Sequence, residues 1–487
     1  MGFLWATHAR FPFALDVMEF AVLQHVMRVL QHQPIYDVAQ PGFAALAYNP
    51  LYYFAVLPMV QLLGPGLFAL RVFSILGGLG CAAVLYRIVA GETRSAWWGW
   101  LAVGLFAAAY RAMDAYLETA HSDSWMIFTA LLGTWLIGRS RSRLGNWAGL
   151  LLLVASFWFK QHGVFFALGG ALFLTWRDGW ARSWTYWLAL LLLIPALDVL
   201  AGTALFGPRF HYYTWEVPRG WSHLGPGTFL RPLAFFSRRY GVLLVSALIL
   251  VLQLAWKDRR RVSAWHFQLP FAMLTALLGA LDRDSSNNVF IPLGVWTVLV
   301  GSLALQRLAT RPVPARGIRL DRLAILLSFA LLFYDPRSVL TSPRAGDRYA
   351  ELIRMLRALP GSVYAPWIGQ LPGDYRFFPA VHWAALDDMT RAGGNGPQAA
   401  RAALAPAIHP PGRAYILTNR PLKGYPGLDL LSPYYVLDAD LGDRFAALKG
   451  LPRRWDHGWP RYLYRYAPQE AGARALPGGV RDGRSRG

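Results

Sequence analysis

The stretch that decides the fold is LLLVASFWFKQHGVFFALGGALF, from Leu151 to Phe173. Two apolar runs flank one polar triplet, Lys160, Gln161 and His162. The runs 146–159 and 163–176 are predicted to be two membrane-crossing helices joined as a tight hairpin, with the triplet at its tip. No acidic residue lies within the stretch, so the charge of Lys160 needs an explanation from elsewhere in the chain.

Similar apolar runs recur along the 487 residues, of which 55% are hydrophobic and 15% charged. A soluble protein could bury such a composition in two or three domains. The arrangement favours membrane spans instead, because each run approaches the length that crosses about 30 Å of hydrocarbon. We therefore predict a mainly α-helical, polytopic membrane protein with about ten spans. The spans are roughly 67–90, 96–113, 122–138, 146–159, 163–176, 184–205, 240–256, 265–281, 288–306 and 322–338.

The net charge of +21 could indicate nucleic-acid binding, but arginines cluster in alternate connections between spans. This pattern is typical of cytoplasmic loops, so we expect no nucleic-acid partner. The clusters include Arg87 and Arg94, Arg139 to Arg143, Arg177 and Arg182, Lys257 to Arg261, and Arg307 to Arg319. The single cysteine, Cys81, lies in an apolar run and forms no intrachain disulfide.

The remaining connections must face outward, and most of the unusual polar residues fall on them. They are the chain up to residue 66, Asp114 to Asp123, the triplet at Lys160, the loop 206–238, Asp282 to Asn288, and everything after about 340. We interpret Asp114 and Glu118, one helical turn apart, as a solvated face. This concentration of polar residues on the outward-facing connections indicates an active surface that faces the periplasm or cell exterior.

Four parts follow from this pattern. Residues 1–66 form a first outer loop, and 67–339 form the transmembrane bundle. Residues 340–470 are predicted to be a small extracytoplasmic α/β domain, with strands in GSVYAP, GRAYILTN and RYLYRYAP. Residues 471–487 are predicted to be a disordered basic tail.

The first loop carries two acidic residues. Its segment 18–32 is predicted to be an amphipathic interfacial helix, with a polar stripe that includes Gln24. Glu19 falls on the apolar stripe, where a carboxylate is costly unless it is paired, bound to metal or used in chemistry. Asp16 lies at or before the helix start, where it either caps the helix or takes part in chemistry.

Other outer residues also have two interpretations each. Lys160 is either a lysine extended along the membrane boundary or a cation that meets an anionic lipid headgroup. Asp123 is either a helix cap or a ligand for sugar hydroxyls. The segment DRDSSNN, with Arg283 and Asn287, is either a polar turn or a phosphate or sugar contact. The aromatic ring of Tyr36, in PIYDVAQPG, either packs on substrate or belongs to an interfacial belt.

The motifs together resemble a known family, the membrane-embedded glycosyltransferases of the GT-C class. The resemblance is to the bacterial branch related to protein O-mannosyltransferases and aminoarabinose transferases. It is carried by the acidic pair Asp16 and Glu19, then QPIYD, NPLYY, HSDSW with Asp123, KQ at Lys160, and NNVFIPL. The order and outward placement of these motifs match over roughly residues 14–300.

The resemblance implies sugar transfer from a polyprenyl-phosphate carrier to an extracytoplasmic glycolipid, polysaccharide or protein, with inversion at the anomeric carbon. It places the chain in the bacterial inner membrane. Asp16 is then the candidate catalytic base or metal ligand, with Glu19 its neighbour, and Mg²⁺, Mn²⁺ or Ca²⁺ could bind the two. The substrate-binding candidates are Lys160, Arg283 and His162 for the phosphate, Gln161 for phosphate or sugar, and Asp123, Asn287 and Tyr36.

The sequence departs from the family at its start, because only MGFLWATHARFPFAL precedes Asp16, where the family has a spanning helix. We expect the true start codon to lie upstream. The alternative function is a transporter or flippase for a lipid-linked or anionic solute, which usually carries its charges near the midplane. A non-catalytic assembly subunit with the same fold is a third possibility.

Overall fold

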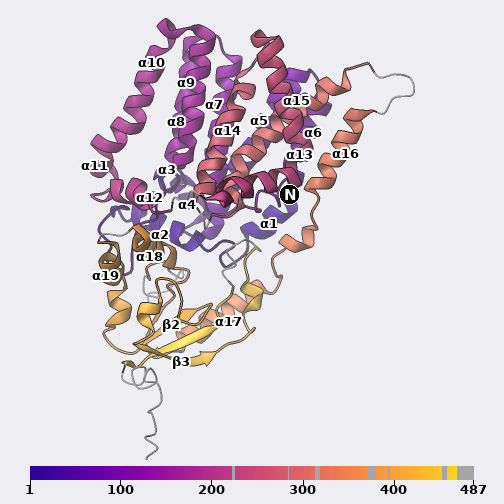
Figure 1. Ribbon diagram of the computed structural model, residues 1–487. Coiled ribbons are helices and arrows are strands. Elements are labelled where there is room, and N and C mark those ends of the chain that lie inside the picture. Colours follow the sequence, from indigo (N-terminus) through magenta and orange to yellow (C-terminus); the bar gives the residue numbers. More distant parts are fainter. Residues whose placement is uncertain are drawn as a thin grey trace, which may run out of the picture.

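The computed structural model describes residues 1–221, 225–282, 285–312, 319–369, 380–392, 395–451 and 458–468. Figure 1 shows a bundle of long helices, a layer of short N-terminal helices at one end of it, and a small sheet beyond that layer. The predicted site residue Arg283 and the predicted tail 471–487 lie outside the described residues.

The bundle helices lie close to the predicted positions. They are α5 (Leu67–Thr93), α6 (Ala96–Ala108), α7 (Asp123–Arg139), α8 (Arg143–Phe159), α9 (Val164–Asp178), α10 (Trp180–Leu191) with its π-helical continuation Leu192–Ala201 and α11 (Gly202–Phe206), α13 (Pro226–Lys257), α14 (Ala264–Leu281), α15 (Ile291–Ala309) and α16 (Leu320–Leu332). Five stretches are long and apolar enough to cross a membrane: 67–93, 180–206, 226–257, 264–281 and 287–309. The chain is therefore mainly helical, with apolar helices suited to a membrane.

Helix α15 is central because it is apolar on all sides, which leaves no face suited to water. Every residue from Ile291 to Leu303 is buried. Trp296 in this helix stacks on Phe166 of α9, with ring centroids 4.6 Å apart.

Helices α7 and α8 pack closely through facing glycines. A Cβ atom at Gly133 would lie 2.6 Å from the carbonyl oxygen of Gly149, so no larger residue fits without moving the helices apart. The two helices are antiparallel, and the start of α7 therefore lies beside the end of α8. This contact brings Asp123 and Lys160 to the same place in the fold.

The layer at the end of the bundle consists of α1 (Gly2–Ala9), α2 (Glu19–Leu30), α3 (Leu51–Ala55), α4 (Leu57–Leu63) and α12 (Val217–Arg219). The predicted helix 18–32 is confirmed as α2, but its polar stripe is exposed only in part: Gln31 is exposed and Arg28 is half-buried. Gln24 is buried and donates to the carbonyl of Gly42 at 3.0 Å, because later parts of the chain cover this helix.

The predicted outer loop 206–238 is also largely wrong. A π-helical segment (Tyr212–Glu216) and α12 occupy its first half, and α13 already begins at Pro226. The polar residues of 226–239 lower the hydropathy without ending the helix, so the apolar pattern marked only the part of α13 that begins near residue 240.

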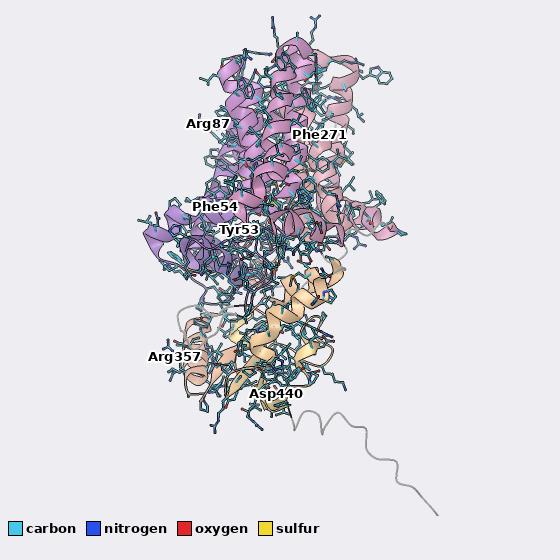
Figure 2. The ribbon with its side chains drawn as sticks, turned by 90° about the vertical axis from the view of Figure 1, so that its left-hand side faces the viewer. Tyr53, Phe54, Arg87, Phe271, Arg357 and Asp440 are labelled. Atoms are coloured by element: carbon cyan, nitrogen blue, oxygen red, sulfur yellow. The ribbon has the colours of Figure 1, made fainter. Side chains whose placement is uncertain are left out.

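The C-terminal part contains α17 (Ala345–Arg357), α18 (Trp383–Ala392), α19 (Gly396–Ile408) and four strands. The strands β1 (Ser362–Tyr364), β2 (Ala414–Thr418), β3 (Tyr435–Asp440) and β4 (Tyr462–Tyr466) pair in the order β1-β2-β4-β3, of which only β1 and β2 are parallel. The three predicted strands are confirmed as β1, β2 and β4. Figure 2 shows Asp440 and Arg357 in this C-terminal part and Arg87 on the distant bundle.

This part packs on the segment that carries Asp16. His382 donates through Nε2 to the carbonyl of Val17 at 2.9 Å. The backbone N–H of Leu451 donates to the carbonyl of Leu15 at 3.2 Å. Residues more than 350 positions later in the chain thus fix the backbone on both sides of Asp16.

Candidate active site

Asp16 lies in the turn before α2 and is almost fully buried. Its Oδ1 accepts from the backbone N–H of Met18 at 3.0 Å and from the hydroxyl of Tyr116 at 3.3 Å. The first contact is an Asx-type turn, close to the predicted helix cap. The second joins the first outer loop to the segment between α6 and α7.

Glu19, three residues later, is paired. Both oxygens of its carboxylate accept from the guanidinium of Arg71, at 2.9 and 2.6 Å, and both residues are buried. The N–H groups of Leu15 and Ala120 donate to the same carboxylate at 2.7 and 2.8 Å. A bidentate partner and two backbone donors offset the cost of burying this charge on the apolar face of α2.

Arg71 also organises the chain before Asp16. Its guanidinium donates to the carbonyls of His8, Phe11 and Phe13, so one side chain fixes the N-terminal segment to α5. Arg71 was not among the predicted site residues. Its signal is an arginine inside an otherwise apolar span, where an ionisable group needs a partner.

The cation at Lys160 has an acidic partner after all. Its Nζ lies 2.8 Å from Oδ1 of Asp123, and Nδ1 of His121 lies 2.5 Å from Oδ2 of the same carboxylate. All three residues are buried. Asp123 comes from α7, which the glycine contact holds against α8, so the absence of acidic residues near Lys160 in the sequence was misleading.

Aromatic rings connect this ion pair to Asp16. The ring of Tyr48 lies 5.8 Å from Nζ of Lys160 and packs edge-on against His121 at 4.8 Å. Tyr116, which donates to Asp16, packs against the other side of the cluster, 5.3 Å from His121. Burial raises the pKa of the Tyr48 hydroxyl well above its ordinary value, and the carboxylates of Asp388, Asp123 and Asp16 add to the rise. The phenol therefore stays protonated.

Asp388, on α18, was not predicted, because nothing near it in the sequence marks a site; its charge contributes to the raised pKa of Tyr48. Its Oδ1 accepts from Nε1 of Trp221 at 2.8 Å. Burial raises the pKa of Asp388 to about 8, and the negative charges of Asp387 and Asp282 add to this, while Trp221 opposes it.

Three other predicted residues, Gln161, His162 and Tyr36, lie next to members of this cluster in the chain or hydrogen-bond to its backbone. Gln161 donates to the carbonyl of Ala47 at 2.9 Å. His162 is half-buried, and burial followed by the charge of Lys160 lowers its pKa to about 4. Tyr36 is fully buried, and its hydroxyl donates to the carbonyl of Tyr48. Tyr36 therefore supports the loop that carries Tyr48.

Asn287 lies at a different place, between α14 and α15. Its backbone N–H donates to Oδ2 of Asp114 at 2.9 Å, and its side-chain oxygen accepts from Arg231 at 3.3 Å. The structure therefore separates Asn287 from the residues around Lys160 and assigns it to a second polar region.

The solvated face predicted for Asp114 and Glu118 is wrong, since both are buried. Glu118 accepts from Nε1 of Trp5 at 3.0 Å and lies 2.6 Å from Nδ1 of His8, which ties α1 to the bundle. The backbone here is not helical. Asp114 and Ala115 have φ values of 61° and 50°, so the two carboxylates point to different partners.

A divalent cation does not fit the acidic pair of the first loop. Both oxygens of Glu19 are used by Arg71 and by backbone donors, and the guanidinium would repel a cation. Within the described parts of the chain, no group of three His, Cys, Asp or Glu residues is arranged to hold a metal.

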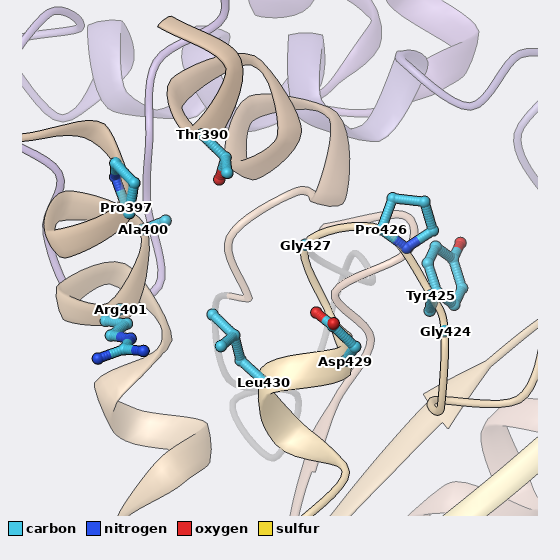
Figure 3. A pocket seen from close by; sticks show the side chains of 10 residues that line it. All are labelled: Thr390, Pro397, Ala400, Arg401, Gly424, Tyr425, Pro426, Gly427, Asp429 and Leu430. Atoms are coloured by element: carbon cyan, nitrogen blue, oxygen red, sulfur yellow. The ribbon is translucent and has the colours of Figure 1, made fainter. Parts of the chain in front are cut away.

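A cavity of about 330 Å³ lies in the C-terminal part and contains Arg401 and Asp429 among its lining residues (Figure 3). It is lined only by residues 390–430. It shares no residue with the cluster around Asp16 and Lys160, which we define as Asp16, Tyr48, Tyr116, His121, Asp123, Lys160 and Asp388.

The fold is GT-C-like, as comparison with solved structures shows. The crystal structure of ArnT, an aminoarabinose transferase, from Cupriavidus metallidurans bound to undecaprenyl phosphate matches with a TM-score of 0.56 and 13% identity over 96% of each chain. The apo structure of the same protein matches with a TM-score of 0.55 and 12% identity, again over 96% of each chain. No protein-family model and no curated protein matches the sequence.

Proposed function

We propose that the chain is an inverting membrane glycosyltransferase that moves a sugar from a polyprenyl-phosphate carrier to a hydroxyl-bearing acceptor. The observation that carries the proposal is the cluster itself. A nearly buried carboxylate, Asp16, lies with a protonated tyrosine and a lysine at one end of an apolar bundle. The likeness to a structure that binds undecaprenyl phosphate supports a lipid-linked donor.

The chemistry needs a base, a stabilised leaving group and alignment. Asp16 takes the proton from the acceptor hydroxyl as its oxygen attacks the anomeric carbon. The bond between that carbon and the phosphate oxygen breaks, and the polyprenyl phosphate leaves with the bonding electrons. Lys160, with Gln161 and His162 beside it in the chain, hydrogen-bonds the departing phosphate.

The contacts divide the predicted residues into roles. Glu19 is a positioning residue, because its carboxylate is committed to Arg71 and sets the backbone at Leu15, next to Asp16. Asp123 holds Lys160 and His121 in place. The hydroxyl of Tyr36 donates to the backbone carbonyl of Tyr48 and so supports the position of Tyr48. The hydroxyl of Tyr48 is the group that we expect to meet the sugar.

The same proposal places the molecule in the bacterial inner membrane with about ten spans. The chain up to residue 66 and the α/β part from 340 to 470 lie outside the cytoplasm. The position of Arg87, on the bundle far from the sheet in Figure 2, supports a cytoplasmic side opposite the cluster. The placement of the cluster at the end of the bundle favours an enzyme over a transporter, whose charges usually lie at the midplane.

The test is transfer by the purified protein in lipid, supplied with polyprenyl-phosphate mannose, glucose, galactose and arabinose and with membrane extract as acceptor. Asp16→Asn should lower turnover at least about 100-fold, the size of a lost general base, without altering thermal stability. The matched control is Asp443→Asn, which removes an exposed carboxylate that does not belong to the cluster. Equal turnover in Asp16→Asn would show that another carboxylate is the base, and no transfer from any donor would refute the proposal.

A further inference from the structure

The imidazole of His121 has one ring nitrogen that is paired and one that is not. Nδ1 lies 2.5 Å from Oδ2 of Asp123. Nε2 is buried, and no hydrogen-bond partner for it is found among the described residues. The rings of Tyr48 and Tyr116 pack edge-on against the imidazole, with centroids 4.8 and 5.3 Å away, so two aromatic rings flank this free nitrogen.

The protonation state of His121 follows from these contacts. A carboxylate only accepts, so Nδ1 carries a hydrogen and donates it to Asp123. In a neutral ring Nε2 then has a lone pair, whereas in an imidazolium it has a second N–H. A buried N–H of a charged ring without an acceptor costs more free energy than a buried lone pair without a donor. The protein without a bound substrate therefore holds His121 as the neutral ring.

The charges next to His121 balance in this state. The carboxylate of Asp123 pairs through Oδ1 with the ammonium of Lys160 at 2.8 Å. The two phenols that flank the imidazole are uncharged at neutral pH. From α5, the hydroxyl of Ser74 donates to the carbonyl of His121 at 3.3 Å and carries no charge. Further out, the carboxylate of Asp16 adds a negative charge, so the surroundings favour a further cation over a further anion.

A phosphate diester that binds at Lys160 changes this balance. It brings one more negative charge, and the single ammonium then faces two anions. Such an uncompensated charge is costly in a buried site. A proton that moves from solvent to Nε2 of His121 converts the ring to an imidazolium and restores the balance. The hydrogen on Nδ1 stays in its bond to Asp123, so the ring need not turn.

We propose that binding of the donor phosphate at Lys160 is coupled to the uptake of one proton by His121. The imidazolium balances the carboxylate of Asp123 while the ammonium of Lys160 contacts the phosphate. His121 is thus a positioning residue that acts through Asp123 and Lys160. This coupling rests on the proposed function, in which Lys160 meets the donor phosphate, and it concerns the charge of the donor and not its sugar.

Proton uptake makes the affinity for the phosphate rise as the pH falls. Full linkage to one proton changes Kd about tenfold per pH unit within the range in which histidine titrates, about pH 5 to 8. Two neighbouring groups titrate outside most of this range. Burial and the charge of Lys160 lower the pKa of His162 to about 4, and burial raises the pKa of Asp388 to about 8. We expect Kd to rise at least about fivefold from pH 5.5 to pH 7.5.

The test is calorimetric binding of a polyprenyl methyl phosphate to the full-length protein in detergent. This diester has one negative charge at every pH used and no sugar, so any change with pH belongs to the protein. The wild type should show the rise in Kd and a binding heat that depends on the ionisation enthalpy of the buffer. His121→Asn keeps an amide donor for Asp123 but cannot titrate, so its Kd should not change with pH. The matched control, His162→Asn, should keep the pH dependence of the wild type.

The other outcomes contradict the coupling in distinct ways. A pH dependence that persists in His121→Asn and disappears in Asp16→Asn or His162→Asn would assign the proton to that residue instead. Binding heats of the wild type that are independent of the buffer would refute proton uptake, whether or not His121→Asn folds. The uncharged polyprenol should bind without proton uptake, and uptake with polyprenol would show that the phosphate is not the cause.

Failure of the coupling is separate from failure of the proposed function. Sugar transfer together with binding that does not depend on pH would refute the coupling alone. Binding that depends on pH as expected, without transfer from any donor, would refute the transferase alone. If the phosphate diester binds no more tightly than the polyprenol, Lys160 does not hold the phosphate, and both are refuted.

Discussion

At the scale of single residues, the pair of Glu19 and Arg71 decides where Asp16 lies. Replacing Glu19 with Gln leaves a buried guanidinium without its counter-charge and weakens the contacts with Leu15 and Ala120. Such a loss costs about 3–5 kcal/mol. We expect Glu19→Gln to lower the thermal unfolding temperature of the purified protein strongly and turnover along with it.

The control for this variant is the exposed pair of Asp258 and Arg261, 2.8 Å apart on the arginine-rich side of the bundle. Asp258→Asn should change stability by less than about 1 kcal/mol, because solvent screens exposed ion pairs. A Glu19→Gln protein with unchanged stability and lost turnover would contradict the positioning role and return Glu19 to the chemistry.

The second prediction concerns Lys160 and Asp123. Lys160→Met leaves the buried carboxylate with only His121 beside it, and Asp123→Asn leaves the ammonium unpaired. Each single change should destabilise the protein, and the double variant should be more stable than the sum of the two losses predicts, by about 0.5–3 kcal/mol. Thermal unfolding of the four proteins measures this coupling.

Activity then separates two roles for Lys160. If its ammonium contacts the donor phosphate, the double variant regains stability but still shows a raised KM for the donor. Recovery of both stability and donor KM in the double variant would limit Lys160 to holding Asp123. Strict additivity of the two stability losses would contradict the ion pair.

At the scale of elements, α18 carries a carboxylic acid to the end of the bundle. The pKa of Asp388 is raised from its ordinary value to about 8, so the folded protein holds a proton between about pH 4 and pH 8 that the unfolded chain releases. The stabilising effect of this proton is complete below pH 4 and is lost as the pH rises towards 8.

Asp388→Asn keeps the shape and removes the titration. We expect the variant to gain thermal stability over the wild type progressively from pH 5 to pH 8, with no further gain above. Asp429→Asn, which removes an exposed carboxylate from the same part of the chain, should give a constant difference. A constant difference for Asp388→Asn as well would show that the side chain is ionised in the fold.

Apolar patterns predicted most helices, because burial in lipid or protein requires continuous hydrophobic length. The apolar patterns failed for elements that are stabilised by contacts with neighbouring elements and not by a continuous apolar sequence. The first turns of α13 mix apolar residues with Pro232 and several arginines, and β3, YVLDAD, is half exposed. Both are ordered by tertiary contacts that local hydropathy does not encode.

At the scale of the whole molecule, the candidate site combines residues from distant positions. Asp16, Asp123 and Lys160 could be proposed from the sequence because acidic and basic residues stand out beside apolar spans. Their partners could not. The pairing of Lys160 with Asp123 depends on which helices touch, and Asp388 depends on how the C-terminal part folds back onto the first loop.

The orientation of the whole molecule gives the last prediction. Cys81 is fully buried, and replacing it with Ser gives a background in which any single introduced cysteine reports its own surroundings. Gly442→Cys, beside the sheet, should react in intact cells with a maleimide that cannot cross the inner membrane. Arg260→Cys, in the arginine-rich connection between α13 and α14, should react only after that membrane is opened, because basic loops remain in the cytoplasm. The reverse pattern would place Asp16 and Lys160 on the cytoplasmic side, where an extracytoplasmic acceptor could not reach them.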